Sequence, residues 1–254
     1  MTADRAVPTD AVRVTPGPVC LMPRDTFTGR PPALPVTAVV ERRDDDGRWS
    51  PEKSARVVTT PTGARLMPSL AVPAGRPPGG EHGVCRMRVR LVSPYLLDAE
   101  HPDGVEFDAP APGVPAVTPI LLLPLPAYPF PPETRLLGGR VVARRPVMPR
   151  SAAGPPPGAP VVGALVTAGA RHDPGHIPPV GEPWTDFAAT AQGGAFRLPL
   201  RGPGSRVAAG AAADADTEWF TVTVTGPPGR GGPPVTVHLP AQDITATGFV
   251  IEVP

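Results

Sequence analysis

The residues best suited to bind a metal ion lie in one short stretch. His172 and His176 are four positions apart, with Asp173 between them, and imidazole and carboxylate groups are usual zinc ligands. On a helix the two histidines would share a face, but Pro174 and Gly175 disfavour a helix. A third and a fourth ligand are not evident nearby. We therefore favour a polar loop that binds no metal.

Other candidate chemical groups lack the partners that their chemistry requires. Ser205 follows Gly-Pro-Gly but lacks the second glycine of a serine-nucleophile elbow. The glycines at 229–232 are not followed by the lysine and serine or threonine of a phosphate-binding loop. Asp214, Asp216 and Glu218 could hold calcium only weakly, because the twelve-residue calcium-loop pattern is absent. We predict a non-enzymatic protein with no catalytic residue, metal or cofactor.

The tryptophans leave one binding alternative open, a carbohydrate-binding or surface-binding accessory module. Trp184 lies in the loop-like stretch Gly-Glu-Pro-Trp-Thr-Asp and is the candidate ligand contact, whereas Trp219 begins an alternating strand and is expected to pack. The chain holds three Trp, two Tyr and seven Phe. With so few large rings, each is expected to be needed for packing.

The composition favours an all-β protein with long loops. Of the 254 residues, 42 are Pro and 28 are Gly, and proline both removes a backbone donor and clashes inside helices. The apolar residues form short runs bounded by Pro and Gly clusters, which is typical of many-stranded proteins. The net charge of +1 provides no long-range field for nucleic acid or an acidic membrane, so we expect neither as a partner.

The cysteines and the apolar runs bear on location. Cys20 and Cys85 lie far apart without metal-binding spacing, and the first residues lack the pattern of a signal peptide. The richest apolar run, 120–123, is bounded by prolines and is far shorter than a membrane span of about 18 residues. We expect a cytoplasmic protein with reduced thiols, and a Cys20–Cys85 disulfide is the less favoured alternative.

The N-terminal half is predicted to hold a flexible lead at 1–11 and a β domain at 12–124. Its clearest strand is 84–92, where apolar residues alternate with Arg86, Arg88 and Arg90. Because successive strand side chains point to opposite faces, one face is expected to be buried and the arginines to form a candidate interaction surface. The other predicted strands are 13–15, 19–22, 36–42, 56–60, 105–107 and 118–123.

A segment rich in proline and aromatic residues, 125–137, separates the two halves. It alternates proline with Tyr128 and Phe130, which favours an extended, stiff backbone. We interpret it as the joint between two domains, with both rings packing on one domain or contributing to an interaction surface. A proline-rich ligand for an SH3-like module is the weaker alternative.

The C-terminal half, 138–254, shows the rhythm of a single antiparallel sandwich. Its loops are rich in Pro, Gly and Ala, notably at 151–160 and 202–215. The predicted strands are 136–143, 161–168, 195–200, 219–225, 235–239 and 248–253.

Three motifs stand in this half: Gly-Arg-Val-Val from Gly139, Pro-Val-Val-Gly-Ala-Leu-Val from Pro160, and Thr-Ala-Gln-Gly-Gly-Ala-Phe-Arg-Leu from Thr190. Their order resembles the carboxypeptidase regulatory-like family, whose domains are seven-stranded, transthyretin-type sandwiches. The resemblance implies an accessory module that supports, positions or binds. Two departures are Ala191, where the family has Asp, and an insertion at about 169–189.

The motif residues also have a physical interpretation. Gly163 and Ala164 suit a strand position that another backbone approaches closely. Gly194 suits a turn that needs positive φ, and Phe196 would then fill the core.

Residues 23–30, Pro-Arg-Asp-Thr-Phe-Thr-Gly-Arg, and the joint resemble proteins encoded with contractile injection systems and phage-tail-like particles. In those systems regulatory-like sandwiches recur on cap, adaptor and baseplate-associated components. The resemblance implies a structural subunit of a large assembly, bound to other protein subunits and to copies of itself, without a cofactor.

Overall fold

The computed structural model describes residues 19–70, 85–109, 116–144, 158–172, 176–177, 179, 182–207, 217–228, 232–245 and 249–254. This part of the chain is all-β, with three short 3-10 segments, η1 (Pro68–Leu70), η2 (Gln192–Gly194) and η3 (Ala241–Thr245). The predicted fold class is therefore confirmed. None of the described helical segments is long and apolar enough to cross a membrane. The predicted lead at 1–11 and strand at 13–15 lie outside the described residues.

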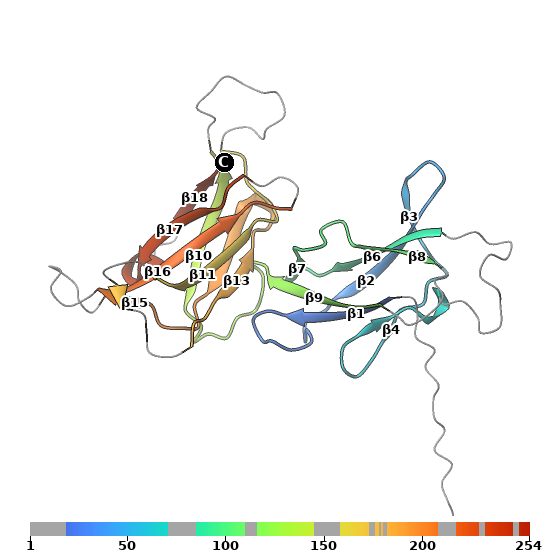
Figure 1. Cartoon of the computed structure of the whole chain (residues 1–254), viewed down its shortest axis with the longest axis horizontal. Coiled ribbons are helices and arrows are strands. Elements are labelled where there is room, and N and C mark those ends of the chain that lie inside the picture. Colours follow the sequence, from blue (N-terminus) through green and yellow to red (C-terminus); the bar gives the residue numbers. More distant parts are fainter. Residues whose placement is uncertain are drawn as a thin grey trace, which may run out of the picture.

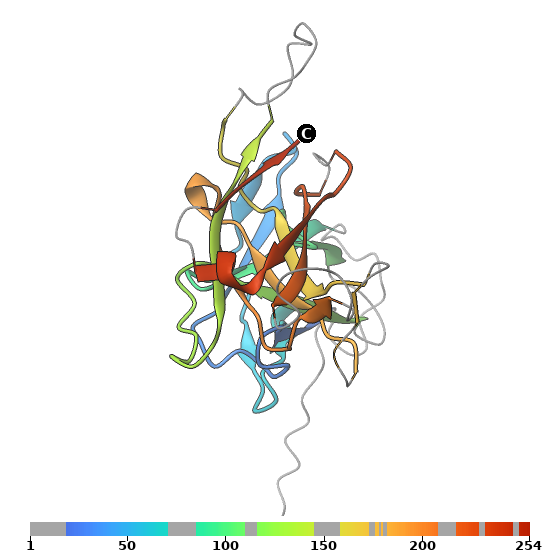
Figure 2. The ribbon, with the colours of Figure 1, turned by 90° about the vertical axis from the view of Figure 1, so that its left-hand side faces the viewer.

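Two β domains lie side by side along the long axis of the molecule (Figure 1). Each has its own hydrophobic core. Viewed along that axis, the C-terminal domain lies in front of the N-terminal one (Figure 2).

The N-terminal domain is built from two sheets, ordered β4-β5-β1-β9-β7 and β3-β2-β6-β8. β1 and β9 pair in parallel, from Val19 opposite Ala116 to Asp25 opposite Leu122. The strands are β1 (Val19–Asp25), β2 (Thr37–Arg43), β3 (Trp49–Pro51), β4 (Val58–Thr59), β5 (Arg65–Leu66), β6 (Cys85–Val92), β7 (Leu96–Asp98), β8 (Val105–Ala109) and β9 (Ala116–Pro124).

The core of this domain lies between the inner faces of its two sheets. Leu21 and Ile120 come from one sheet, and Met87 and Val89 from the other; all four are at most 2% exposed. The alternation predicted for β6 is confirmed, because the two core residues of β6 flank Arg88 on the opposite face.

The C-terminal domain also contains two sheets, β14-β10-β18 and β12-β15-β16-β11-β13, with β17 paired to β16. Seven of its strands have four or more residues, the number that the family resemblance implies, and β12 and β15 are shorter. The strands are β10 (Leu136–Ala143), β11 (Leu165–Ala170), β12 (His176–Ile177), β13 (Asp186–Ala189), β14 (Ala195–Pro199), β15 (Ser205–Val207), β16 (Glu218–Thr225), β17 (Val235–Pro240) and β18 (Phe249–Val253).

Two details of the family motifs differ from the prediction. The stretch 169–189 is not simply an inserted loop, because it supplies β13, which pairs with β11. β11 begins at Leu165 rather than Val161, since Gly163 has φ +75° and interrupts the extended backbone. A Cβ on Gly163 would meet only Pro227, at 3.8 Å. Positive φ, and not a close backbone approach, therefore explains that glycine.

The remaining motif residues agree with their predicted roles. Gly194 has φ +70°, and a Cβ there would lie 2.3 Å from the carbonyl oxygen of Val141. Phe196 is 2% exposed in the core and Ala164 is fully buried. The close backbone approach occurs at Gly139, where a Cβ would lie 2.6 Å from the carbonyl oxygen of Phe249 and 2.8 Å from the Phe196 ring.

Candidate functional site at the domain junction

The three arginines of β6 face neighbouring carboxylates. Glu41 on β2 is only 6% exposed and accepts hydrogen bonds from Arg88 Nε at 2.6 Å and from Arg90 Nε at 2.9 Å. These bonds, above all the one from Arg90, hold the pKa of Glu41 below its ordinary value. Arg86 pairs with Glu106 at 2.9 Å. The arginine face is therefore an ion-pair ladder within one sheet.

The aromatic residues of the joint are fastened to the N-terminal core. Tyr128 is 5% exposed, and its hydroxyl donates to Asp25 Oδ2 at 2.6 Å. Burial and this hydrogen bond raise the pKa of Tyr128 above its usual range. Phe27 lies edge-on to both Tyr128 and Phe130, at centroid distances of 5.6 and 5.1 Å. Tyr128 thus lies in the interior, not on the predicted interaction surface.

Trp184 also packs within its own domain. Its Nε1 donates to the carbonyl oxygen of Pro203 at 3.0 Å, and its ring lies so close to Gly202 that a Cβ there would be 2.2 Å from Nε1. The ring is edge-on to Phe220, at 6.2 Å between centroids. These contacts leave the Trp184 ring half-buried and its N–H engaged.

The predicted chemical groups are not assembled into a reactive centre in the described part of the chain. There, no group of three or more His, Cys, Asp or Glu could hold a metal ion. His176 lies on β12, with its ring 5.8 Å from Trp219, and His172 is exposed. The Ser205 hydroxyl donates to the Trp219 carbonyl oxygen at 3.3 Å. Cys20 and Cys85 form no disulfide, and Asp214, Asp216 and 229–231 lie outside the described residues.

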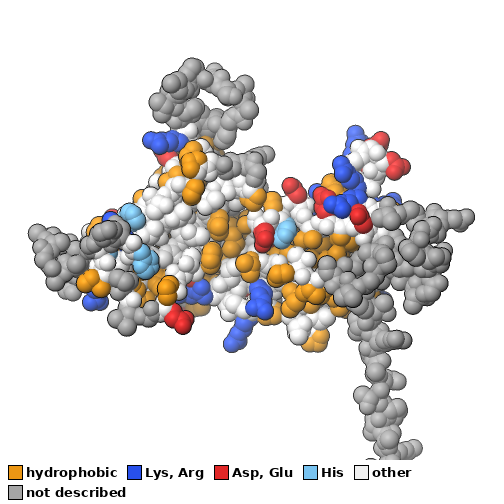
Figure 3. All heavy atoms as spheres, in the orientation of Figure 1, with side chains coloured by type: hydrophobic (Ala, Val, Ile, Leu, Met, Phe, Trp, Pro, Cys, Tyr) orange, Lys and Arg blue, Asp and Glu red, His pale blue; other side chains and the backbone are white. Residues whose placement is uncertain are grey.

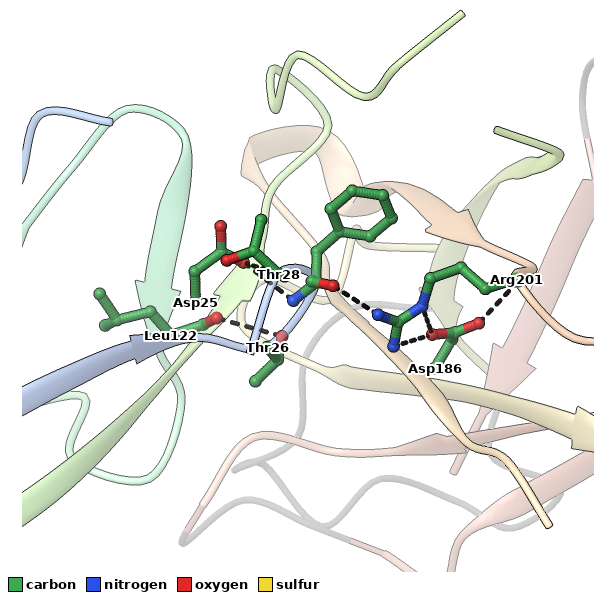
Figure 4. A network of polar contacts seen from close by, with 7 residues as sticks. Asp25, Thr26, Thr28, Leu122, Asp186 and Arg201 are labelled. Carbon is green, nitrogen blue, oxygen red and sulfur yellow. Dashed lines mark hydrogen bonds and ion pairs between the residues drawn. The ribbon is translucent and has the colours of Figure 1, made fainter. Parts of the chain in front are cut away.

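The residues that join the two domains form a polar network (Figure 4), which we call the latch: Asp186 and Arg201 of the C-terminal domain with Phe27 of the N-terminal one. Asp186, 1% exposed, forms an ion pair with the Arg201 guanidinium and accepts the Arg201 backbone N–H at 2.8 Å. The same guanidinium donates to the Phe27 carbonyl oxygen. It also lies 5.2 Å from the centroid of the Phe27 ring.

The turn after β1 presents Phe27 to the latch. Asp25 Oδ1 accepts the Phe27 N–H at 2.8 Å, and Thr26 donates its N–H and Oγ1 to the Leu122 carbonyl at 3.0 and 3.1 Å. A second arginine reinforces the junction, because Arg197 Nη1 donates to the Pro126 carbonyl at 3.1 Å. Both domains thus fix the groups that meet at the latch.

A cavity of about 350 Å³ opens beside this network, between the two domains. Figure 3 shows hydrophobic side chains gathered in this central region. The cavity is mostly apolar and contains one charged side chain, Glu100. Its lining residues are Thr26, Ala99, Glu100, Leu121 and Leu123 from the N-terminal domain, and Gly163, Leu165, Phe187, Thr225, Gly226 and Pro228 from the C-terminal one.

The latch and the cavity were not anticipated from the sequence. Phe27 and Arg201 are 174 positions apart, and Asp186 lies in the stretch interpreted as an insertion. The one local signal is an arginine directly after the apolar run 195–200, which marks a charge at a strand end without indicating its partner.

Comparison with known proteins yields little similarity. A scan of protein-family models gives no match, and neither does a comparison with curated proteins. Among solved structures, a streptococcal ancillary pilin is similar at 13% identity and a TM-score of 0.26, over 93% of this chain and 62% of the pilin chain. This chain therefore spans less than two thirds of the pilin, and a likeness at that TM-score carries no argument.

Proposed function

We propose that the chain is a non-enzymatic, structural, protein-binding subunit of a large cytoplasmic assembly. The observation that carries this proposal is the latch. Its Arg201 satisfies the buried Asp186 carboxylate and holds the Phe27 carbonyl of the other domain. A joint fixed in this way sets a constant spacing between two sandwiches, which is the property that an assembly subunit requires.

The contractile-tail-like setting, at a cap or adaptor position, rests on the sequence resemblance of 23–30 and the joint. Sheet edges give such a subunit a means of docking, because edge strands carry backbone groups that can pair with another chain. Within the described residues, β18 ends the three-stranded sheet and carries Val250 at 54% exposure. The carbohydrate-binding alternative lacks such support, because the ring and N–H of Trp184 are already engaged.

The test is a pull-down of the tagged full chain from native lysate, followed by negative-stain imaging. We expect ring-shaped or tail-like particles that carry the chain, together with sheath or tube proteins. A matched Arg201→Ala sample should retain binding at single edges but lose ordered particles, because the spacing is no longer fixed. A chain that elutes without any large partner and is retained on a polysaccharide column would contradict the proposal.

A further inference from the structure

The cavity between the domains continues into an exposed apolar strip on the N-terminal domain. Val117, Pro119 and Leu121 alternate along β9 and point to the face opposite the core; Val117 and Leu121 are 57% and 51% exposed. Met22 on β1 lies opposite Pro119 in the parallel register and widens the strip. Leu121 also lines the cavity, so the strip and the cavity form one continuous surface, which we call the junction groove.

The groove exists because the outer faces of two sheets meet there. Leu165 and Phe187 lie on the solvent-side face of their sheet, since they flank the fully buried Val166 and Ala188 in the alternating pattern. Leu121 belongs to the corresponding outer face of the N-terminal sheet. Sheet faces that meet water are ordinarily polar. Contact between the two domains accounts for the apolar residues that it buries, such as Leu123, but not for Val117 and Leu121, which stay more than half exposed.

The length and the area of the groove indicate what kind of molecule binds there. From Val117 to Leu121 the strand rises about 13 Å, and of the strip only Leu121 lines the cavity, so the strip extends past the cavity. Each outward residue of a sheet covers roughly 30 Å², so the strip offers about 100–200 Å², far below the roughly 800 Å² per partner of a stable dimer. One extended segment matches this area, and a second copy packed sheet on sheet does not.

The charges beside the groove add polarity. Arg24 is exposed opposite Leu121 in the register of β1 and β9, and Glu100 lies at the cavity. Leu121 lines the same cavity, and Glu100 follows β7, which pairs with β9 on the side away from β1. A segment lying along the strip would therefore meet a positive charge on one side and a negative charge on the other, both near Leu121. Complementary charges on the partner would therefore fix its direction.

We propose that the junction groove binds an extended segment of a partner protein, with one large apolar side chain in the cavity and smaller apolar side chains along Val117, Pro119 and Leu121. The segment carries an acidic residue that faces Arg24 and a basic residue that faces Glu100. This inference rests on the proposed subunit role, because it assigns one of the surfaces through which such a subunit binds its partners.

The test is a titration of the full chain with a synthetic peptide, Val-Thr-Leu-Glu-Phe-Lys-Thr, whose two charged residues flank the phenylalanine that enters the cavity, followed by methyl NMR and fluorescence anisotropy. We expect the methyl resonances of Leu121, Leu123 and Leu165 to shift. A peptide with Ser in place of Val, Leu and Phe should not bind. Leu121→Asp and the cavity-filling Thr225→Trp should each weaken binding by about tenfold or more. Ile177→Asp, at a residue of similar exposure on the other domain, should leave binding within about twofold.

Several results would overturn the proposal. Equal losses in Leu121→Asp and Ile177→Asp would show that the contact is not at the groove. Binding of 1-anilinonaphthalene-8-sulfonate at Leu121 without binding of the peptide would assign the groove to a small apolar molecule. A doubling of the particle mass that depends on Leu121 would assign it to a second copy.

The peptide titration tests the groove, and the pull-down tests the subunit role, so the two proposals can fail independently. If the Leu121→Asp variant binds the peptide as tightly as the unaltered chain and also enters the assembly normally, the groove assignment fails and the subunit role stands. If the unaltered chain has no large partner but binds the peptide through Leu121, the assembly role fails and the groove assignment stands.

Discussion

The two domains are stabilised by different kinds of interior. The C-terminal core is built around large rings, with Phe196 and Phe220 at most 2% exposed, and the one buried carboxylate found among the described residues of that domain, Asp186, belongs to the latch at the junction. The N-terminal domain instead buries the carboxylates of Asp25 and Glu41, at 2% and 6% exposure, and satisfies them with Tyr128 and two arginines. The stability of the first domain should depend on shape, and that of the second on charge and pH.

Removing a core ring from the C-terminal domain should have the largest effect. Phe196→Ala should lower the free energy of unfolding by about 3–5 kcal/mol, since it removes apolar contacts and leaves a cavity beneath Gly139. Urea unfolding followed by the fluorescence of Trp184 and Trp219 measures this loss. Val250→Ala, at an exposed position, is the matched control and should have little effect. A loss below about 1 kcal/mol in Phe196→Ala would contradict a shape-dependent core.

Tyr128→Phe should have the next largest effect, on the N-terminal domain. It removes the only side-chain donor found for Asp25 Oδ2 among the described residues, and hydrogen bonds to charged groups contribute about 1.5–3 kcal/mol. Urea unfolding followed by the fluorescence of Trp49 is the measurement. Phe130→Leu retains the Asp25 bond and serves as the comparison. Equal unfolding midpoints for Tyr128→Phe and the unaltered chain would show that the buried bond is not stabilising.

The same tyrosine should make the N-terminal domain sensitive to alkali. Its pKa is raised in the folded state above the unfolded value of about 10, so the folded chain holds the proton more tightly. The stabilisation is therefore complete below about pH 10 and falls as the pH rises above it. Urea midpoints between pH 8 and 11 should decline more steeply for the unaltered chain than for Tyr128→Phe. Parallel curves would contradict the assignment.

Some strands of this fold can be predicted from the sequence, and others cannot. Period-two alternation is a local property, so β6, β16 and β17 could be recognised from residue order. β7 and β13 have three and four residues and are too short to show the period. Their positions depend on pairing with β9 and β11, which is a tertiary effect.

The functional surface was harder to predict than the fold. Tyr128 was a candidate for packing or for an interaction surface and Trp184 for a ligand contact, yet Tyr128 is buried in the N-terminal core and Trp184 is half-buried against the C-terminal one. Of the groove residues, Leu121 was predicted as an ordinary strand residue, and Phe187 lay in the stretch interpreted as an insertion. Only the meeting of two outer sheet faces makes them a surface.

The latch should contribute less to stability than Tyr128 but more to shape. Arg201→Ala leaves the buried Asp186 with a backbone donor only, and the guanidinium is 44% exposed, so solvent screening limits the loss to about 1 kcal/mol. Small-angle X-ray scattering should show a broader distribution of domain separations in this variant. Arg86→Ala, which removes a pair within the N-terminal domain, should leave that distribution unchanged. Identical distributions for Arg201→Ala and the unaltered chain would contradict the latch.

Arg86→Ala should have the smallest effect. Arg86 faces Glu106 and Asp108 at the solvent-exposed end of the ladder, where surface ion pairs contribute little. Its urea midpoint should equal that of the unaltered chain. Arg88→Gln should lower the midpoint measurably, because it removes a bond to the buried Glu41. Equal effects of the two substitutions would show that burial does not distinguish the two ends of the ladder.

Mass photometry of the purified full chain, alone and after addition of native lysate fractions, tests the subunit role most directly. The account predicts closed oligomers or a discrete large complex containing the chain, and a loss of uniform particle mass in Arg201→Ala. A monomer of 26.2 kDa at every concentration, with no large complex in any fraction, would contradict it.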